Sequence, residues 1–169
     1  MGAKGFNIVE EGHIVTNYVP VDMDDTAGAD SLVIVEMGNY SHASIIISIG
    51  TDPRAAGVIT VESCDDLVPT TATEIMFPYY RYETQQLVAN GDVPGDKTWT
   101  TTAAAGLIPA AKGFAVMYVI ELDDDMLVSG DVGFRVCMVD PAAASVGNVI
   151  TVLSGARYAK SSASQMTVY

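Results

Sequence analysis

Residues 113–122 read Gly-Phe-Ala-Val-Met-Tyr-Val-Ile-Glu-Leu, and residues 133–139 follow an acidic turn with Gly-Phe-Arg-Val-Cys-Met-Val. Both segments are short and rich in β-branched and aromatic residues, which is typical of β-strands because ordinary helices are longer. Residues 149–153 form a third segment of this kind. Alternate residues should form apolar faces, namely Phe114, Val116, Tyr118, Ile120 and Leu122 on the first strand and Val132, Phe134, Val136 and Met138 on the second. An opposing layer must bury these faces.

The rest of the chain is also built from short β-prone segments that Gly, Pro and Asp turns separate. These segments predict further strands at residues 6–9, 13–21, 31–37, 43–49, 58–64, 97–102 and 165–169. Residues 65–112 are the hardest to assign. This region includes an aromatic segment that contains Pro78, and the proline restricts the segment to a sheet edge or a bulge. No stretch of 12 or more residues has helical periodicity. We therefore predict an all-β fold, an antiparallel jelly-roll-like β-sandwich, as a single domain of residues 1–169 with candidate arms at 1–12 and 160–169.

Composition and charge exclude several classes of partner. Hydrophobic residues make up 49% of the 169 residues and charged residues 17%, so the chain can bury a core. No apolar run approaches the roughly 20 residues of a membrane helix, and the N-terminus lacks the apolar core of a signal peptide, so we expect neither membrane insertion nor export by that route. The formal charge of −13 leaves no basic patch for nucleic acid. It also repels copies of the chain, so self-assembly would need close apolar contact.

Residues that could perform chemistry are sparse. The two cysteines, Cys64 and Cys137, lie in apolar strand-like segments, and we expect buried free thiols, with a disulfide as the alternative. The two histidines, His13 and His42, belong to no triad or zinc-binding pattern, and Gly-x-Ser-x-Gly is absent. We therefore expect no enzymatic activity, no catalytic residues and no cofactor.

Acidic residues gather in clusters that could in principle bind calcium. The clusters comprise Asp22, Asp24, Asp25 and Asp30, then Asp65 and Asp66, then Glu121, Asp123, Asp124, Asp125 and Asp131. None has the spaced Asp-x-Asp-x-Asp-Gly pattern of a calcium loop, so we predict no metal ligand. We interpret these carboxylates as solvated turns.

Aromatic residues around Pro78 give the best candidate for a binding surface. This segment contains Phe77, Tyr79, Tyr80, Arg81 and Tyr82, and Tyr and Arg are enriched at binding hot spots. The alternative is an edge strand whose aromatic side chains pack on the chain's own core. Further interface candidates near the C-terminus are Arg157, Tyr158, Met166 and Tyr169. A β-prone terminal arm could add a strand to a neighbour's sheet.

Several motifs together resemble a known family. They are, in order, the Asn39-Tyr40 turn before an alternating strand at 43–49, the sequence Tyr-Val-Ile-Glu-Leu-Asp at 118–123, Gly-Phe-Arg-Val at 133–136, and Leu-Ser-Gly-Ala-Arg-Tyr-Ala at 153–159. This order resembles small structural proteins encoded among the head genes of tailed bacteriophages. The resemblance covers residues 31–64 and 113–159, and the C-terminal motif is its most specific part.

The resemblance implies a virion protein without enzymatic activity, a capsid decoration or cement protein that binds the outer capsid surface and bridges neighbouring subunits. The implied partners are the major capsid protein and further copies of the chain, with a trimer as one form of homo-oligomer. The implied location is the virion, assembled in the host cytoplasm. The first alternative is a connector of the neck, tail or fibre base. The second is a carbohydrate-binding β-sandwich, which would need exposed aromatic side chains in a groove.

Overall fold

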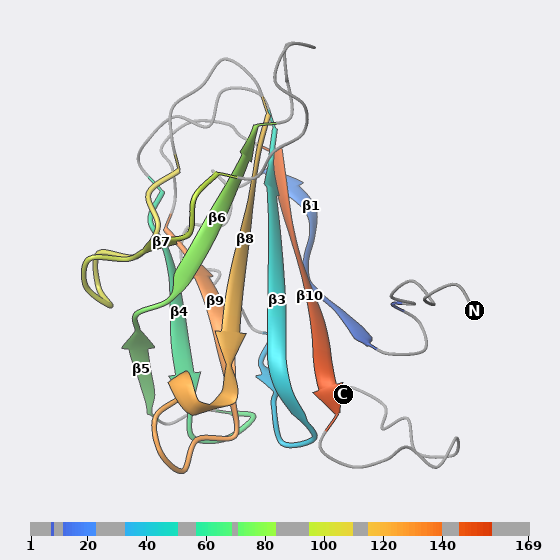
Figure 1. The fold of residues 1–169 in the computed structure, drawn as a ribbon, viewed down its shortest axis with the longest axis vertical. Coiled ribbons are helices and arrows are strands. Elements are labelled where there is room, and N and C mark those ends of the chain that lie inside the picture. The colour runs from blue at the N-terminus through green and yellow to red at the C-terminus, as the bar shows by residue number, and fades with distance from the viewer. Residues whose placement is uncertain are drawn as a thin grey trace.

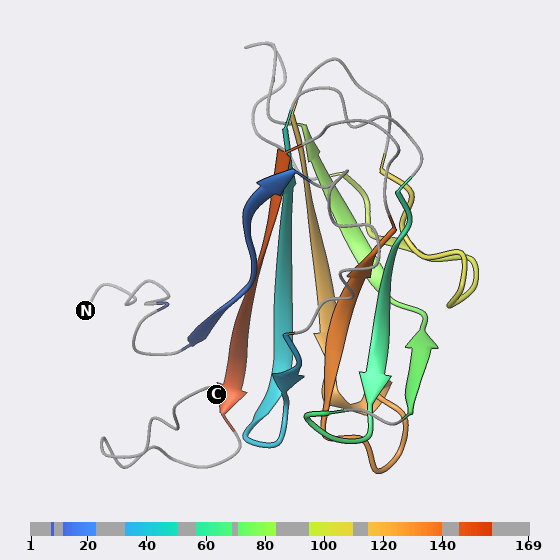
Figure 2. The same cartoon turned by 180° about the vertical axis from the view of Figure 1, so that it is seen from behind.

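The computed structural model describes residues 8, 12–22, 33–50, 57–68, 71–83, 95–109, 115–139 and 146–156. These residues form two antiparallel sheets that pack face to face (Figures 1 and 2). The strands are β1 (His13–Asp22), β2 (Val35–Glu36), β3 (Tyr40–Ile49), β4 (Ile59–Cys64), β5 (Ala72–Ile75), β6 (Pro78–Glu83), β7 (Thr98–Trp99), β8 (Val116–Asp123), β9 (Gly133–Met138) and β10 (Val146–Ala156). A single 3-10 turn, Asp124–Met126, follows β8. The predicted all-β antiparallel sandwich is confirmed, and no helix in the described residues has the length and hydropathy of a membrane span.

Both sheets pair strands from distant parts of the chain. The larger sheet has six strands in the order β1-β10-β3-β8-β6-β7, and the smaller has four in the order β2-β9-β4-β5. Strand β1 pairs with β10, β2 with β9, β3 with β8 and β4 with β5. The first three of these pairs join an early strand to a late one, and β6 and β7 extend the larger sheet beyond β8.

The core lies between the sheets and follows the period-two pattern of the strands. From Ala43 onward, every second residue of β3 is buried there, namely Ala43, Ile45, Ile47 and Ile49. On β8 the buried residues are Val116, Tyr118, Ile120 and Leu122. The smaller sheet contributes Val35, Val61, Phe134 and Val136. The predicted faces are thus confirmed, except that Val132 precedes β9 and is 36% exposed and that Phe114 lies outside the described residues.

Several strands differ in length or position from the prediction. Of the strand predicted at 31–37, the described residues 33–37 contain only the short β2 at Val35–Glu36, which pairs with Phe134 and Gly133 of β9. The region 65–112 contains β5, β6 and β7. Strand β7 overlaps the strand predicted at 97–102, and β6 lies in the aromatic segment around Pro78, but between β8 and β7 instead of at a sheet edge. Of the strand predicted at 6–9 only Ile8 is described, and it is helical, not extended. The strand predicted at 165–169, the candidate arm at 160–169 and the rest of the arm at 1–12 except Gly12 lie outside the described residues.

Strand β4 is more deeply buried than its alternating sequence predicts. Ile59 and Leu107 exchange backbone hydrogen bonds of 2.9 and 2.7 Å, so the loop before β8 extends the sheet where β5 ends. Gly106 has a φ of +51°, and a Cβ there would lie 2.4 Å from the carbonyl oxygen of Ile59. The loop thereby covers Thr60, whose exposure is only 6%.

Neither cysteine forms a disulfide, but the prediction that both are buried holds only for Cys64, because Cys137 is half-buried. Cys64 is fully buried, and this burial raises the pKa of its thiol to about 11. A thiol with so high a pKa stays protonated at neutral pH and is a poor nucleophile.

Candidate functional site: the outer face of the six-stranded sheet

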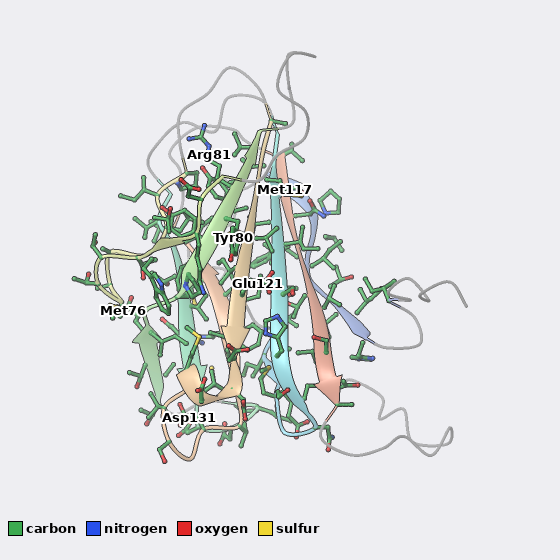
Figure 3. All side chains as sticks on the ribbon, in the orientation of Figure 1. Met76, Tyr80, Arg81, Met117, Glu121 and Asp131 are labelled. Atoms are coloured by element: carbon green, nitrogen blue, oxygen red, sulfur yellow. The ribbon has the colours of Figure 1, made fainter. Side chains whose placement is uncertain are left out.

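Four hydrophobic or aromatic side chains line up across the outer face of the larger sheet. Ile150 is directly opposite Ile46, Ile46 is opposite Val119, and Val119 is opposite Tyr80. Directly opposed residues of antiparallel strands share one face, so these side chains form a continuous line over β10, β3, β8 and β6, here called the apolar row. Figure 3 shows Tyr80 on this face together with Met117 and Glu121 of β8.

The apolar row is only partly shielded from solvent. Each of its four residues is half-buried, whereas their inward-facing neighbours on β3 and β8 are fully buried. On the side toward the start of β1, Ile14 is 49% exposed, whereas Val152, which is opposite it on β10, is buried. The described part of the chain places no layer over this face, whereas the inner face is covered by the smaller sheet.

The sequence contains a signal for this face that a period-two pattern alone does not capture. Residues 45–47 are three consecutive isoleucines, and residues 116–120 are uninterrupted apolar or aromatic residues. Such continuous runs are typical of strands that are covered on both faces. Assigning only Ile45, Ile47 and Ile49 to a core face leaves Ile46 and Val119 without a role.

The two flanks of the apolar row differ in charge. Toward the end of β8, the next two pairs along the strands are Ser44 with Glu121 and His42 with Asp123. In the opposite direction the next pair is Ser48 with Met117, and Asn148 is opposite Ser48 on β10. One flank therefore carries two carboxylates and an imidazole, and the other carries no charge among these residues.

On the charged flank, His42 bridges the two carboxylates. Its Nδ1 lies 2.7 Å from Asp123 Oδ1, and its Nε2 lies 2.8 Å from Glu121 Oε2. Partial burial lowers the pKa of His42, but the hydrogen bonds to Asp123 and Glu121 and the negative charges of these residues outweigh it, so the pKa is raised above its ordinary value. The protonated ring can donate to both carboxylates at once, which a neutral ring cannot do.

This cluster does not have the geometry of a nucleophile and its base. The Ser44 hydroxyl donates to Glu121 Oε2 at 2.7 Å and lies 3.3 Å from His42 Nε2. Because carboxylates engage both ring nitrogens, neither nitrogen is free to accept the Ser44 proton, as the base of a serine nucleophile must. Among the described residues, no group of three or more His, Cys, Asp or Glu side chains is arranged to hold a metal ion.

The interpretation of the acidic clusters as solvated turns is wrong for two of their members. Glu121 and Asp123 lie on β8, where their register with β3 brings them to His42. Asp131 does lie in a turn, but it accepts a hydrogen bond of 2.5 Å from the buried Ser63, which in turn accepts one of 3.0 Å from the Val128 amide. These carboxylates therefore have defined partners within the fold.

The interface residues predicted around Pro78 separate onto different surfaces. Phe77 is fully buried in the core, and its amide donates to Thr100 Oγ1 at 3.2 Å, so its assignment to a partner surface is wrong. Tyr79 is half-buried and meets Tyr118 edge to face with ring centroids 6.1 Å apart. Arg81 is half-buried opposite Tyr118 in register, and only Tyr80 belongs to the apolar row.

The remaining predicted interface residues cannot be placed on this surface. The side chain of Tyr82, together with Arg157, Tyr158, Met166 and Tyr169, lies outside the described residues. Sequence reasoning also gave no binding role to Trp99, which is 51% exposed beside β6, with the Lys97 ammonium 5.5 Å from its ring centre. Met76, just before β6, is 50% exposed.

Comparisons with protein-family models, curated proteins and solved structures find no match to this chain. The outer face of the larger sheet is the feature that departs most from a solvent-exposed sheet, because an antiparallel sheet facing water normally alternates apolar and polar residues.

Proposed function

We propose that this chain is a structural subunit of a virion, a decoration or cement protein that binds the outer surface of a phage capsid and bridges neighbouring subunits. The observation that carries the proposal is the apolar row, because a strand that is apolar on both faces suits a subunit whose second face is covered after assembly. The motifs at residues 39–49, 118–123, 133–136 and 153–159 supply the link to phage head proteins. In this proposal the chain has no enzymatic activity.

We also propose that the sandwich is of the jelly-roll type. The support is the strand order, in which β1, β10, β3 and β8 form one layer and β2, β9, β4 and β5 form the other. Jelly rolls consist of eight strands in two sheets and are common in viral capsid proteins. Strands β6 and β7 would then be an insertion beside β8.

Stabilisation by such a protein would follow from mass action. A ligand that binds only the assembled lattice lowers the free energy of that state relative to its disassembled parts. Many identical weak contacts around a closed shell add avidity without requiring a tight individual site. The formal charge of −13 is better accommodated on the outer surface than against packaged DNA.

The proposal is tested on particles from cells that carry the gene of this chain. Removing the protein should lower the temperature at which heads release DNA, and adding back the purified chain should restore it. Ile46→Lys, which places a charge in the apolar row, should fail to restore it if the protein acts through this face. Complete and depleted particles that release DNA at the same temperature would contradict a cementing role.

Copy number separates decoration from the connector alternative. A decoration protein is present in hundreds of copies per virion, whereas a neck or tail ring has about 6 to 12 copies because its symmetry is closed. Quantitative gel densitometry of purified particles distinguishes the two. A low copy number would favour the connector.

The exposed Trp99 favours one further candidate, a carbohydrate-binding module. An aromatic ring with a cation beside it is a surface that stacks on sugars or other flat apolar groups. A glycan array with the intact chain and with Trp99→Ala tests this directly. Binding that Trp99→Ala abolishes would support the module, and an array without binding would eliminate it.

A further inference from the structure

We infer that His42, Glu121 and Asp123 form a pH-dependent clasp between β3 and β8. While the ring of His42 carries two protons, it holds both carboxylates, and when it loses one proton it releases Asp123 and keeps Glu121. The clasp is a conformational device of the fold and does not depend on the proposed function. The inference specifies which contact opens, which ring nitrogen keeps its proton and which segment of the chain responds.

The clasp lies where the backbone pairing of β3 with β8 ends. His42 and Asp123 are the terminal pair of this register, and Ser44 with Glu121 is the next pair inward. After Asp123 the chain enters the 3-10 turn Asp124–Met126. Terminal pairs of a ladder open more easily than central ones. The side-chain contacts of His42 are therefore placed to keep the end of this ladder closed.

Holding both carboxylates requires two protons on the ring. The Nδ1 atom lies 2.7 Å from Asp123 Oδ1, and the Nε2 atom lies 2.8 Å from Glu121 Oε2. An ionised carboxylate only accepts hydrogen bonds, and a neutral imidazole has one N–H group. In the neutral ring the other nitrogen would present a lone pair to a carboxylate oxygen, which is repulsive. Loss of one proton therefore opens one of the two contacts.

The surroundings of the two carboxylates determine which contact opens. The side chain of Glu121 is 32% exposed, and its Oε2 also accepts a hydrogen bond of 2.7 Å from the Ser44 hydroxyl. The side chain of Asp123 is 61% exposed, so water can replace its lost donor at little cost. If Nδ1 kept the proton, the bare Nε2 would face the less exposed Glu121. We therefore expect the proton to stay on Nε2 and Asp123 to be released.

The described elements around His42 contribute further titratable groups. Besides Glu121 and Asp123 of β8, they are Asp124 and Asp125 of the 3-10 turn, Tyr40 of β3, and His13 of β1, whose ring stacks on that of Tyr40. On β10, Ser154 is opposite His42. Partial burial lowers the pKa of His42, but the hydrogen bonds to Asp123 and Glu121 and their charges outweigh it and raise the pKa. The clasp is thus closed below the folded-state pKa of His42 and opens as the pH rises through it.

Release of Asp123 acts on the turn that follows it. The Asp123 amide lies 3.5 Å from Met126 Sδ, and the Leu127 amide donates to the Asp124 carbonyl oxygen at 3.3 Å. Met126 and Leu127 also pack against the core. Opening the clasp removes a side-chain contact that links the start of this turn to β3. The Leu127 amide should therefore exchange with solvent more readily when the clasp is open.

The first experiment observes the two ring nitrogens. Nitrogen-15 NMR of the purified full chain distinguishes the neutral tautomers, because protonated and unprotonated ring nitrogens have different chemical shifts. Above the titration of His42, we expect the proton on Nε2 in the wild type and in Asp123→Asn. Glu121→Gln removes the same charge but weakens the partner of Nε2, so it should move the proton toward Nδ1. His13 is the internal control, and neither substitution should change its tautomer.

The second experiment measures opening of the turn. Hydrogen exchange of the Leu127 amide is expressed as a protection factor, which removes the pH dependence of the exchange reaction itself. This factor should fall about two- to fivefold through the titration of His42, the range expected for loss of an exposed ion pair. Asp123→Asn should abolish the fall. The Val132 amide, which donates to the Cys64 carbonyl oxygen at 3.0 Å, is the control and should show no fall.

Each experiment has a result that overturns the inference. A neutral His42 with its proton on Nδ1 would show that Glu121 is released instead of Asp123. A constant Leu127 protection factor, or an equal fall in Asp123→Asn, would show that the clasp does not hold the turn. Neither measurement involves virions, so a failure here is distinct from a failure of the DNA-release assay.

Discussion

The outer faces of the two sheets carry different kinds of side chain at their centres. On the smaller sheet, Glu62 and Arg135 are opposite each other in register, and the Arg135 Nε donates to Glu62 Oε2 at 2.6 Å. At the equivalent place on the larger sheet, Ile46 is opposite Val119. The smaller sheet thus has a charged pair on its outer face, whereas the larger sheet has apolar side chains at the corresponding strand pair. The difference indicates that one face suits contact with water and the other suits being covered.

The largest expected effect comes from comparing the two faces of β3. Ile47→Ala should lower the free energy of unfolding by about 2–5 kcal/mol, because it leaves a cavity between the sheets. Ile46→Ala on the same strand should cost about 1 kcal/mol or less in the monomer, because Ile46 is only half-buried. Urea unfolding at low protein concentration measures both. Equal losses would show that the outer face is part of the monomer's core and would remove the distinction.

A second prediction concerns the loop that extends the smaller sheet beside β4. Gly106→Ala should lower the free energy of unfolding by about 1–3 kcal/mol, through both its positive φ and the clash of the new Cβ with Ile59. Gly130→Ala is the matched control, since Gly130 has a φ of +100° but a Cβ added there would meet nothing within 4 Å. Thermal unfolding should therefore show a larger loss for Gly106→Ala. A larger loss for Gly130→Ala would contradict the close contact of loop and strand.

A third prediction concerns the charged pair on the outer face of the smaller sheet. Arg135→Ala leaves the half-buried Glu62 without its cation and should cost about 1–2 kcal/mol, between the values for exposed and buried pairs. Urea unfolding measures this loss. A variant as stable as the wild type would contradict a stabilising pair between Arg135 and Glu62.

The smallest expected effect is the pH dependence of the charged flank. The pKa of His42 is raised in the folded chain above the unfolded value of roughly 6.5, so the folded state binds its proton more tightly. The stabilisation is fully present below that unfolded pKa and is lost as the pH rises through the folded-state pKa. The difference in unfolding free energy between wild type and His42→Gln should therefore shrink with rising pH. His13→Gln controls for the loss of an imidazole elsewhere, and a constant difference for His42→Gln would contradict the bridge to Glu121 and Asp123.

Much of the fold could be predicted because its information is local. The alternation at Ile45, Ile47 and Ile49 and the faces of β8 and β9 follow from a period of two, which any strand imposes on its side chains. Strand β5 could not be placed, because it carries no clear alternating pattern. The position of β6 between β8 and β7 could not be predicted either, because its pairing with β8 joins segments distant in the sequence. Phe77 illustrates the same limit, since an aromatic residue beside Pro78 suits a core and an interface equally well until the opposing layer is known.

The candidate site was even less accessible to local reasoning. His42 and Glu121 are 79 positions apart in the chain, and nothing near either residue indicates the other. The three consecutive isoleucines at 45–47 did carry a signal, because a strand exposed to water on one face has no need of Ile46. That run of isoleucines indicates that both faces of the strand are apolar. It does not indicate which of the two faces is covered by another part of the same chain.

The sequence by itself determined the all-β class, the faces of the long strands and the surplus of negative charge, because these depend on residue type and on a period of two. Only the tertiary structure decided the register that aligns Tyr80, Val119, Ile46 and Ile150 and that brings His42 to Glu121 and Asp123. Register is a property of paired strands, and a shift by one residue would turn every one of these side chains to the opposite face. It is fixed by the packing of the inner faces against the smaller sheet, so the outer surface is a consequence of the core.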